Sequence, residues 1–286
     1  MGGDDWAALS LDVAEAGGWA GLSIFLFTFM GELGLVKFCT LLVLRQWLGL
    51  EGPAAEKAAG RSWHVAFSVW SVSNSMFALS DLGLLGSFDL GLLDDAHPCA
   101  FGGASQLAPL PRSVTRLFAV QISHYSLALI AHPWIMRGED DFWVMFAHHL
   151  FSILLCAAAL LGRWPVWGVA TILTHDVADL PLDSVLIAKE LHVPWLTSAL
   201  YVITLVTWAG ARCCYFPWYV VRSVLLASAR CDDVGCMFAC AGVTAILGLD
   251  GFWLVKLIRI GLPQVRELLA TRRGDEASPA SAKKQE

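Results

Sequence analysis

Seven apolar runs, each close to the length of a membrane span, constrain this chain more than any other feature. A helix needs about 20 mostly apolar residues to cross the hydrocarbon core of a bilayer. The runs occupy approximately residues 21–44, 63–85, 117–136, 142–161, 164–188, 194–221 and 236–262. Because lipid offers the backbone no hydrogen-bond partners, segments of this length fold as helices. The sequence therefore predicts an all-α, polytopic transmembrane helical bundle of about seven helices, with six to eight allowed.

The composition supports a membrane protein and argues against a nucleic-acid-binding one. Hydrophobic residues make up 57% of the 286 residues and charged residues 15%, against about 45–50% and about 25% in soluble domains. The net charge is −6 and there is no basic stripe, so we expect no nucleic-acid partner. The eight cysteines are scattered without a CxxC pair, so we expect them to pack as small apolar side chains and predict no metal site.

The polar segments predict how the chain is divided. Residues 1–60 contain an acidic start without the basic region of a cleavable signal, the first membrane helix and a basic loop. Residues 61–263 form the main membrane domain. Residues 264–286 are polar and rich in small residues, and we expect a disordered tail there. The connection over 86–111 has no assigned role.

The basic residues predict the orientation in the membrane. Arg45, Lys57 and Arg61 lie between the first two apolar runs, and the C-terminal segment is also basic. Basic segments favour the cytosolic side, so the C-terminus is predicted to be cytosolic and the N-terminus lumenal. Lys283 and Lys284 fit the KKxx pattern for retrieval to the endoplasmic reticulum, which a receptor recognises.

Two groups of ionisable residues lie inside the apolar runs. They are His148 and His149 in the fourth run, and His175, Asp176, Asp179 and Asp183 in the fifth. A charge at membrane depth costs several kcal/mol, so such residues are rare, face a protein interior and usually mark a site.

The acidic residues of the fifth run follow a helical pattern. His175, Asp179 and Asp183 are spaced by four and share one face, with Asp176 beside it. Pro181 removes a backbone hydrogen bond and is expected to bend the helix near this stripe. A bend in a polar membrane helix opens space for water or a substrate headgroup.

The two adjacent histidines project about 100° apart, so at most one points straight into such a cavity. A histidine can exchange a proton near neutral pH, and carboxylates can hold an amine headgroup. We favour an acid–base site. A metal site is the competing chemistry, since three histidines and an aspartate are a plausible ligand set. A buried polar network that only holds helices together is the structural alternative.

At these positions the chain resembles the TLC (TRAM–LAG1–CLN8) membrane family, specifically its ceramide synthase branch. The branch carries an HH pair and, after a fixed gap, an HDxSDxxLE segment; here these are His148-His149 and residues 175–183. Further matches are Asp141-Phe142-Trp143, Met145-Phe146, Gln121-Ile122-Ser123, Tyr125, Gly168, Arg212, Phe216-Pro217 and Arg222. The resemblance covers about residues 61–262, so the main membrane domain is identified as a TLC domain.

Three positions depart from the family pattern. Val166 replaces an Arg, with Arg163 one turn earlier; Leu186 replaces a Lys, with Lys189 one turn later; and Ala178 replaces the usual Ser. Displacement by one turn keeps roughly the same helix face, so we expect these charges to be retained in space.

The resemblance implies an acyl-CoA-dependent N-acyltransferase of the endoplasmic reticulum that joins a fatty acyl-CoA to the amine of sphinganine or a related sphingoid base. It implies catalytic roles for His148, His149, Asp176 and Asp179, and substrate-binding roles for His175, Asp183, Arg212 and Arg222. The acyl group passes either directly to the amine or through an enzyme nucleophile. The expected partners are the two substrates and membrane lipids, with no cofactor besides acyl-CoA as co-substrate, and the resemblance is compatible with a homo- or heterodimer.

Two other functions stay open from the sequence. A non-enzymatic TLC protein that senses, binds or organises membrane lipids or assists trafficking is the alternative, although the complete HH and HDxxD set favours the enzyme. A seven-helix receptor or transporter is a third hypothesis, which rests on helix count alone.

Overall fold

The computed structural model describes residues 3–27, 34–49, 52–84, 109–138, 140–162, 164–228 and 234–277. Over these ranges the chain forms helices and no strand, in eight rods, as the sequence predicted. The elements are α1 (Gly3–Phe27), α2 (Leu35–Leu48), α3 (Pro53–Asp81), α5 (Arg112–Ile135), α6 (Phe142–Leu161), α7 (Pro165–Glu190), α8 (Pro194–Thr207), η4 (Trp208–Val221), α9 (Arg222–Ser228) and α10 (Val234–Ala277). The elements α8, η4 and α9 follow one another without a break and make one rod.

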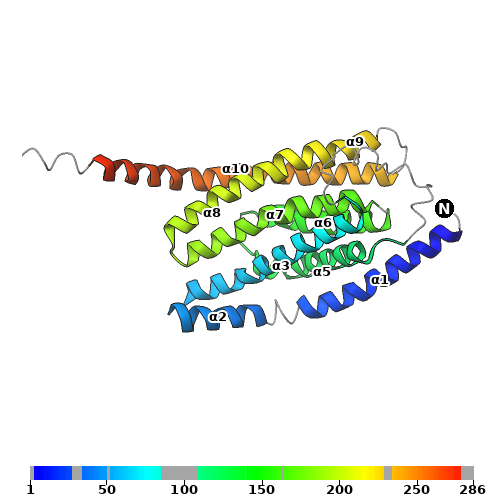
Figure 1. The fold of residues 1–286 in the computed structure, drawn as a ribbon, viewed down its shortest axis with the longest axis horizontal. Coiled ribbons are helices and arrows are strands. Elements are labelled where there is room, and N and C mark those ends of the chain that lie inside the picture. The colour runs from blue at the N-terminus through cyan, green and yellow to red at the C-terminus, as the bar shows by residue number, and fades with distance from the viewer. Residues whose placement is uncertain are drawn as a thin grey trace, which may run out of the picture.

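The rods lie side by side along the long axis of the molecule (Figure 1). The central helix is α7, which packs against α3, α6, α8 and η4. On one side of it α5 joins α1, α3 and α6, and on the other α10 packs on η4, α8 and α6. The junction of α2 and α3 and the C-terminal part of α10 lie at the same end of the bundle (Figure 1).

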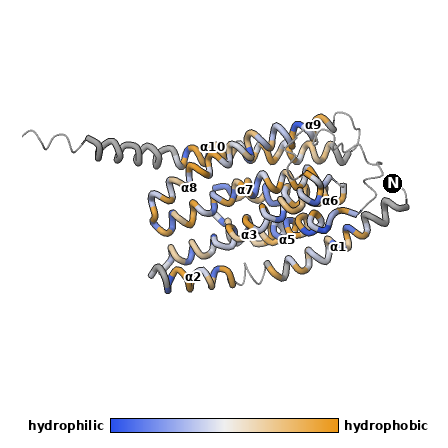
Figure 2. The backbone as a smooth tube through the Cα atoms, in the orientation of Figure 1, coloured by the Kyte–Doolittle hydropathy of each residue, from blue (hydrophilic) through white to orange (hydrophobic). Residues whose placement is uncertain are grey.

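The surface carries large apolar side chains while the interior carries polar ones, which is the arrangement of a protein whose solvent is lipid. Trp134, Trp143 and Trp195 are 71–76% exposed, whereas His175, Asp176 and Arg212 are buried. Hydrophobic positions run along the outer rods, with hydrophilic positions among them in the middle of the bundle (Figure 2). Within the described chain, α5, α6, the α8–α9 rod and α10 are long and apolar enough to cross a membrane. The protein is therefore a multi-pass membrane protein.

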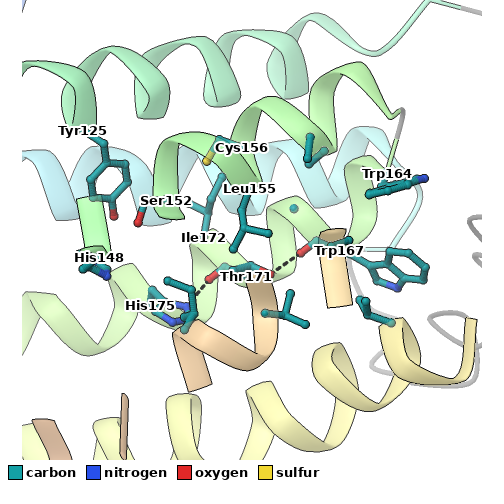
Figure 3. A pocket seen from close by; sticks show the side chains of 17 residues that line it. Tyr125, His148, Ser152, Leu155, Cys156, Trp164, Trp167, Thr171, Ile172 and His175 are labelled. Atoms are coloured by element: carbon teal, nitrogen blue, oxygen red, sulfur yellow. Dashed lines mark hydrogen bonds between the residues drawn. The ribbon is translucent and has the colours of Figure 1, made fainter. Parts of the chain in front are cut away.

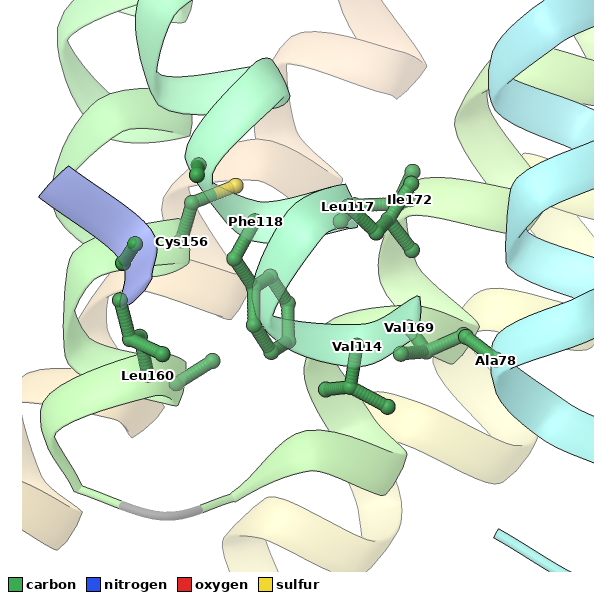
Figure 4. Packing of buried hydrophobic residues seen from close by; sticks show 11 residues of the cluster. Ala78, Val114, Leu117, Phe118, Cys156, Leu160, Val169 and Ile172 are labelled. Atoms are coloured by element: carbon green, nitrogen blue, oxygen red, sulfur yellow. The ribbon is translucent and has the colours of Figure 1, made fainter. Parts of the chain in front are cut away.

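An apolar cluster fixes α7 against α5 and α6 (Figure 4). Phe118 and Leu117 from α5 are fully buried beside Val169 of α7. The close approach depends on Gly168, since a Cβ atom there would lie 2.6 Å from the Phe118 ring and 2.7 Å from the Ala159 side chain. Any side chain at position 168 would push these helices apart.

A π-helical turn pattern occupies the middle of the α8–α9 rod. The backbone N–H of Arg222 donates to the carbonyl of Pro217, five residues back, as π-helical geometry requires. Trp208, Arg212 and Phe216 from this segment are all buried. The segment thus turns a cation and two aromatic rings towards α7 and α10.

The N-terminal region differs from the prediction. We expected one membrane helix over 21–44 followed by a basic loop, but α1 ends and α2 begins inside that interval. Arg45 lies in the last turn of α2, and Lys57 and Arg61 lie within α3, so the expected loop is largely helical. Pro53 supplies the fixed φ that suits the first turn of α3.

The C-terminal region also differs from the prediction. We expected a disordered tail over 264–286, but α10 continues as a helix to Ala277. The expectation is wrong for residues 264–277, where the polar sequence still forms a regular helix. Residues 278–286, with Lys283 and Lys284, and most of the 86–111 connection lie outside the described residues.

Candidate functional site

A narrow apolar cavity runs between α6 and α7 and is closed on a third side by α10. Its volume is about 60 Å³, below the ~300–1,000 Å³ of typical ligand pockets, so a ligand enters only as the lining side chains move apart. Its lining on α7 is Trp164, Trp167, Gly168, Thr171, Ile172 and His175. These positions are three or four residues apart and therefore form one helix face. The wall from α6 follows the same spacing from His148 to Ala159.

The polar groups of the cavity lie together at one end. His148, His175, Tyr125 and Ser152 are at that end, whereas Trp164 lies at the opposite end (Figure 3). The segment between them presents mostly aliphatic side chains. The cavity can therefore accept a hydrocarbon chain with a polar head held among the histidines.

Of the two adjacent histidines, only His148 lines the cavity. Its ring stands edge-on between Tyr125 of α5 and Trp253 of α10, with ring centroids 5.7 Å and 5.2 Å away. Its Nδ1 atom is buried and has no hydrogen-bond partner among the described residues. His149 instead contacts Tyr125 and His132, at 5.9 Å and 5.6 Å. This agrees with the expected 100° separation.

The ring of His175 lies between two hydrogen-bond acceptors. Its Nδ1 atom is 2.7 Å from the carbonyl oxygen of Thr171, and its Nε2 atom is 3.1 Å from Oδ2 of Asp250. Both ring nitrogens of His175 are therefore engaged by neighbouring oxygens, so the ring is fixed in position and neither nitrogen is free towards the cavity.

Arg212 extends the pair of His175 and Asp250 into a network. Its guanidinium donates to Oδ1 of Asp179 (2.5 Å), to Oδ1 of Asp250 (3.3 Å) and to the carbonyl of His175 (2.8 Å). It also lies over the Trp208 ring, 3.9 Å from the centroid. The buried guanidinium is therefore paired with two carboxylates inside the bundle, as a buried charge requires.

Asp176 points to a different group of helices. Gln121 of α5 donates to its Oδ2 atom (2.8 Å), and the Ser71 hydroxyl of α3 donates to the same atom. Gln121 also bonds to Ser71 (2.5 Å), which closes a buried triangle. Asp176 therefore joins α7 to α3 and α5.

The remaining predicted residues lie further from the cavity. Asp183 pairs with Arg61 of α3 at 3.9 Å. Arg222 is exposed, and its guanidinium lies over the Trp218 ring of the same rod, 5.5 Å from the centroid. The structure brings together His148, His175, Asp176, Asp179 and Arg212, but it does not bring Arg222 to them.

Two residues with a place in the site were not assigned a role from the sequence. Asp250 is fully buried, and its carbonyl accepts a bond from the Trp208 indole (3.2 Å). The signal that points to it is a carboxylate inside an apolar span. Tyr125, matched only as part of a motif, lines the cavity beside His148. Over the described ranges, no group of three or more metal-ligating side chains is suited to hold an ion.

Comparison with known proteins gives consistent matches. The family model of the TLC domain matches residues 59–259. Ceramide synthase hyl-1 of Caenorhabditis elegans is 26% identical over 161 residues, which are 56% of this chain and 43% of that protein. Ceramide synthase hyl-2 of the same organism is 24% identical over 174 residues, covering 56% and 52%. Ceramide synthase 1 of Homo sapiens is 23% identical over 248 residues, covering 80% and 68%. The chain spans about half the length of the two nematode relatives.

Proposed function

The chain belongs to the TLC domain family, and on this premise we propose that it is an N-acyltransferase that joins a fatty acyl-CoA to the amine of a sphingoid base. The similarity to ceramide synthases supports this branch of the family. The observation that carries the proposal is the position of His148, which lines the polar end of an apolar cavity and has a buried Nδ1 atom without a hydrogen-bond partner among the described residues. A buried polar atom without a partner is costly, and a substrate would supply the missing partner.

The proposed reaction forms an amide and releases CoA. The substrate ammonium loses a proton to His148, and the free amine attacks the thioester carbonyl. The C–S bond breaks, the attacking nitrogen gives up its second proton, and the leaving thiolate of CoA takes up one proton. In the alternative route, a histidine nitrogen first takes the acyl group and the amine then displaces it. Both routes need an imidazole nitrogen that is free to react, which His148 has and His175 lacks.

The surrounding groups have supporting roles in this proposal. The hydroxyls of Tyr125 and Ser152 lie at the same end of the cavity as His148 (Figure 3) and are placed to donate to the developing oxyanion. Asp176 attracts the substrate ammonium before its proton is removed. The pairing of His175, Asp179, Arg212 and Asp250 holds α7, η4 and α10 in register around the cavity.

The proposed location is the endoplasmic reticulum membrane, with the C-terminus in the cytosol. Arg45, Lys57 and Arg61 belong to α2 and α3 near the end of the bundle from which α10 extends. Positive charge at one end favours the cytosolic side, which is also where acyl-CoA would arrive. Protease protection of a C-terminal tag in sealed microsomes tests this: a tag that resists digestion until detergent is added contradicts it.

The test of the function is acyl transfer by microsomes from a host without its own ceramide synthases. Sphinganine and a panel of acyl-CoAs are supplied, with His148→Ala as the inactive variant and His192→Asn as the control. His192 is exposed and has a φ of 54°, which Asn tolerates. We expect amide product that disappears only with His148→Ala. A well-inserted protein that binds lipid but forms no product would instead support the non-enzymatic alternative.

A further inference from the structure

We propose that Trp164 and Trp167 form the closed end of the cavity and set the longest acyl chain that the enzyme accepts. The inference rests on the proposed acyl transfer and adds a substrate class to it: unbranched acyl groups about as long as the chains of one membrane leaflet, to the exclusion of very long chains.

The length of the cavity follows from its position on α7. His175 and Trp164 are eleven positions apart on one helix face, which at about 1.5 Å per residue is about 16 Å. One leaflet contributes half of the ~30 Å hydrocarbon core of a bilayer, about 15 Å. With the reacting carbonyl at the histidines, a chain of leaflet length fills the cavity up to the two indole rings.

The closed end is built to resist displacement. Trp167 is only 5% exposed and belongs to an apolar cluster with Phe216 and Val220 of η4. The Trp164 ring lies 6.3 Å from it, centroid to centroid. Trp164 also caps the start of α7, where Pro165 restricts the backbone. Moving either ring would disturb the helix start or the packed cluster, so the end acts as a fixed stop.

The character of the lining selects an apolar chain. On α7 the cavity face between the histidine and the tryptophans is Gly168, Thr171 and Ile172, and α10 adds Val243 and Ile246. The Thr171 hydroxyl already donates to the carbonyl of Trp167 (2.8 Å). The interior therefore offers no free charge to a polar group, and a hydrocarbon tail is the ligand that suits it.

The experiment measures the product distribution when saturated acyl-CoAs, rising in two-carbon steps from medium to very long chains, compete for limiting sphinganine. We expect Trp164→Ala and Trp167→Ala each to raise the longest accepted chain by about one two-carbon step or more, because a Trp side chain fills a large volume. Val243→Phe, which narrows the cavity between the histidines and the tryptophans, should shift the distribution to shorter chains. Trp195→Ala, at a 71% exposed position, is the matched control and should leave the distribution unchanged.

The product distribution is a ratio of chain lengths within one sample, so it does not depend on how much of each variant folds. Opposite shifts in the lengthening and shortening variants cannot arise from a general loss of stability. The inference is overturned if the wild type forms product and all three cavity variants keep the wild-type length preference. That result leaves the proposed acyl transfer intact.

A second measurement applies if the wild type forms no product, which would contradict the proposed function. Free fatty acids of increasing length are added to the detergent-solubilised protein, and the rise in its unfolding temperature is measured. This gives the longest accepted chain without turnover. Protection that stops at leaflet-length chains, and extends to longer ones in Trp164→Ala, supports the closed end. Protection independent of both chain length and this substitution overturns it.

Discussion

His175 and Asp250 form a buried hydrogen-bonded pair, with Nε2 of the imidazole 3.1 Å from Oδ2 of the carboxylate. The two residues are 75 positions apart in the chain, and the pair fastens α10 to α7 beside the cavity. Because the Thr171 carbonyl contacts the other ring nitrogen, the orientation of the His175 ring is fixed. It leaves His148 as the imidazole on the cavity wall that is free to react.

Asp250→Asn should therefore reduce both stability and activity. The substitution removes one of the two carboxylates that neutralise the buried Arg212, and it is the one that also bonds to His175. Breaking a buried pair in this way costs about 3–5 kcal/mol. Thermal unfolding in detergent and initial acyl-transfer rates measure the two effects. Asp140→Asn, at an exposed turn position, is the control, and equal behaviour of the two variants would contradict the role of the pair.

His148→Ala should lower the acyl-transfer rate more than His149→Ala. Only His148 lines the cavity, and loss of a general base lowers rates by about 10²–10⁴-fold. His149 contacts Tyr125 from outside the cavity, so its loss should have a smaller effect through the position of that ring. Rates of both variants, normalised to inserted protein, decide the order. A larger loss of rate for His149→Ala would show that His149, and not His148, carries the reacting imidazole.

Asp176→Asn separates a chemical from a structural role of this carboxylate. The amide oxygen of Asn can still accept bonds from Gln121 and Ser71, so the bundle should stay folded and the Tm should change little. The negative charge that attracts the substrate ammonium is lost, and we expect the KM for sphinganine to rise about tenfold or more. An unchanged KM with a lowered Tm would indicate that Asp176 only holds helices together.

The two arginines carried over from the family pattern should behave differently when replaced by Met. Arg212 is 2% exposed and binds two carboxylates, so Arg212→Met leaves Asp179 without this partner and Asp250 with His175 alone, and should destabilise the protein by about 3–5 kcal/mol. Arg222 is exposed beside Trp218, and its loss should change stability by no more than about 0.5 kcal/mol. Chemical or thermal unfolding of both variants in one detergent makes the comparison. Similar losses of stability in the two variants would show that the burial of an arginine does not determine its contribution to stability.

Local patterns in the sequence were sufficient to predict most helices. The fourth apolar run coincides with α6 at 142–161, and the sixth run corresponds to the rod that begins at Pro194. The predictions failed where hydropathy and helicity diverge. Residues 264–277 are polar but helical, and the chain over 21–44 is apolar but does not form one helix. A hydropathy pattern reports what a segment can bury, whereas a helix end depends on turns such as the left-handed Gly49 that closes α2.

The sequence by itself determined that this is a helical membrane protein, and it predicted that His148, His175 and the neighbouring aspartates form one site. Both follow from local features, because the length of an apolar run and the presence of charge within it need no knowledge of distant contacts. The tertiary structure alone decided which of the adjacent histidines lines the cavity, that Asp250 bonds to His175, and that Arg222 lies apart from these residues. These are properties of helix rotation and packing between segments as far apart as α7 and α10. Such contacts arise only when the helices assemble, and residue spacing within one helix does not specify them.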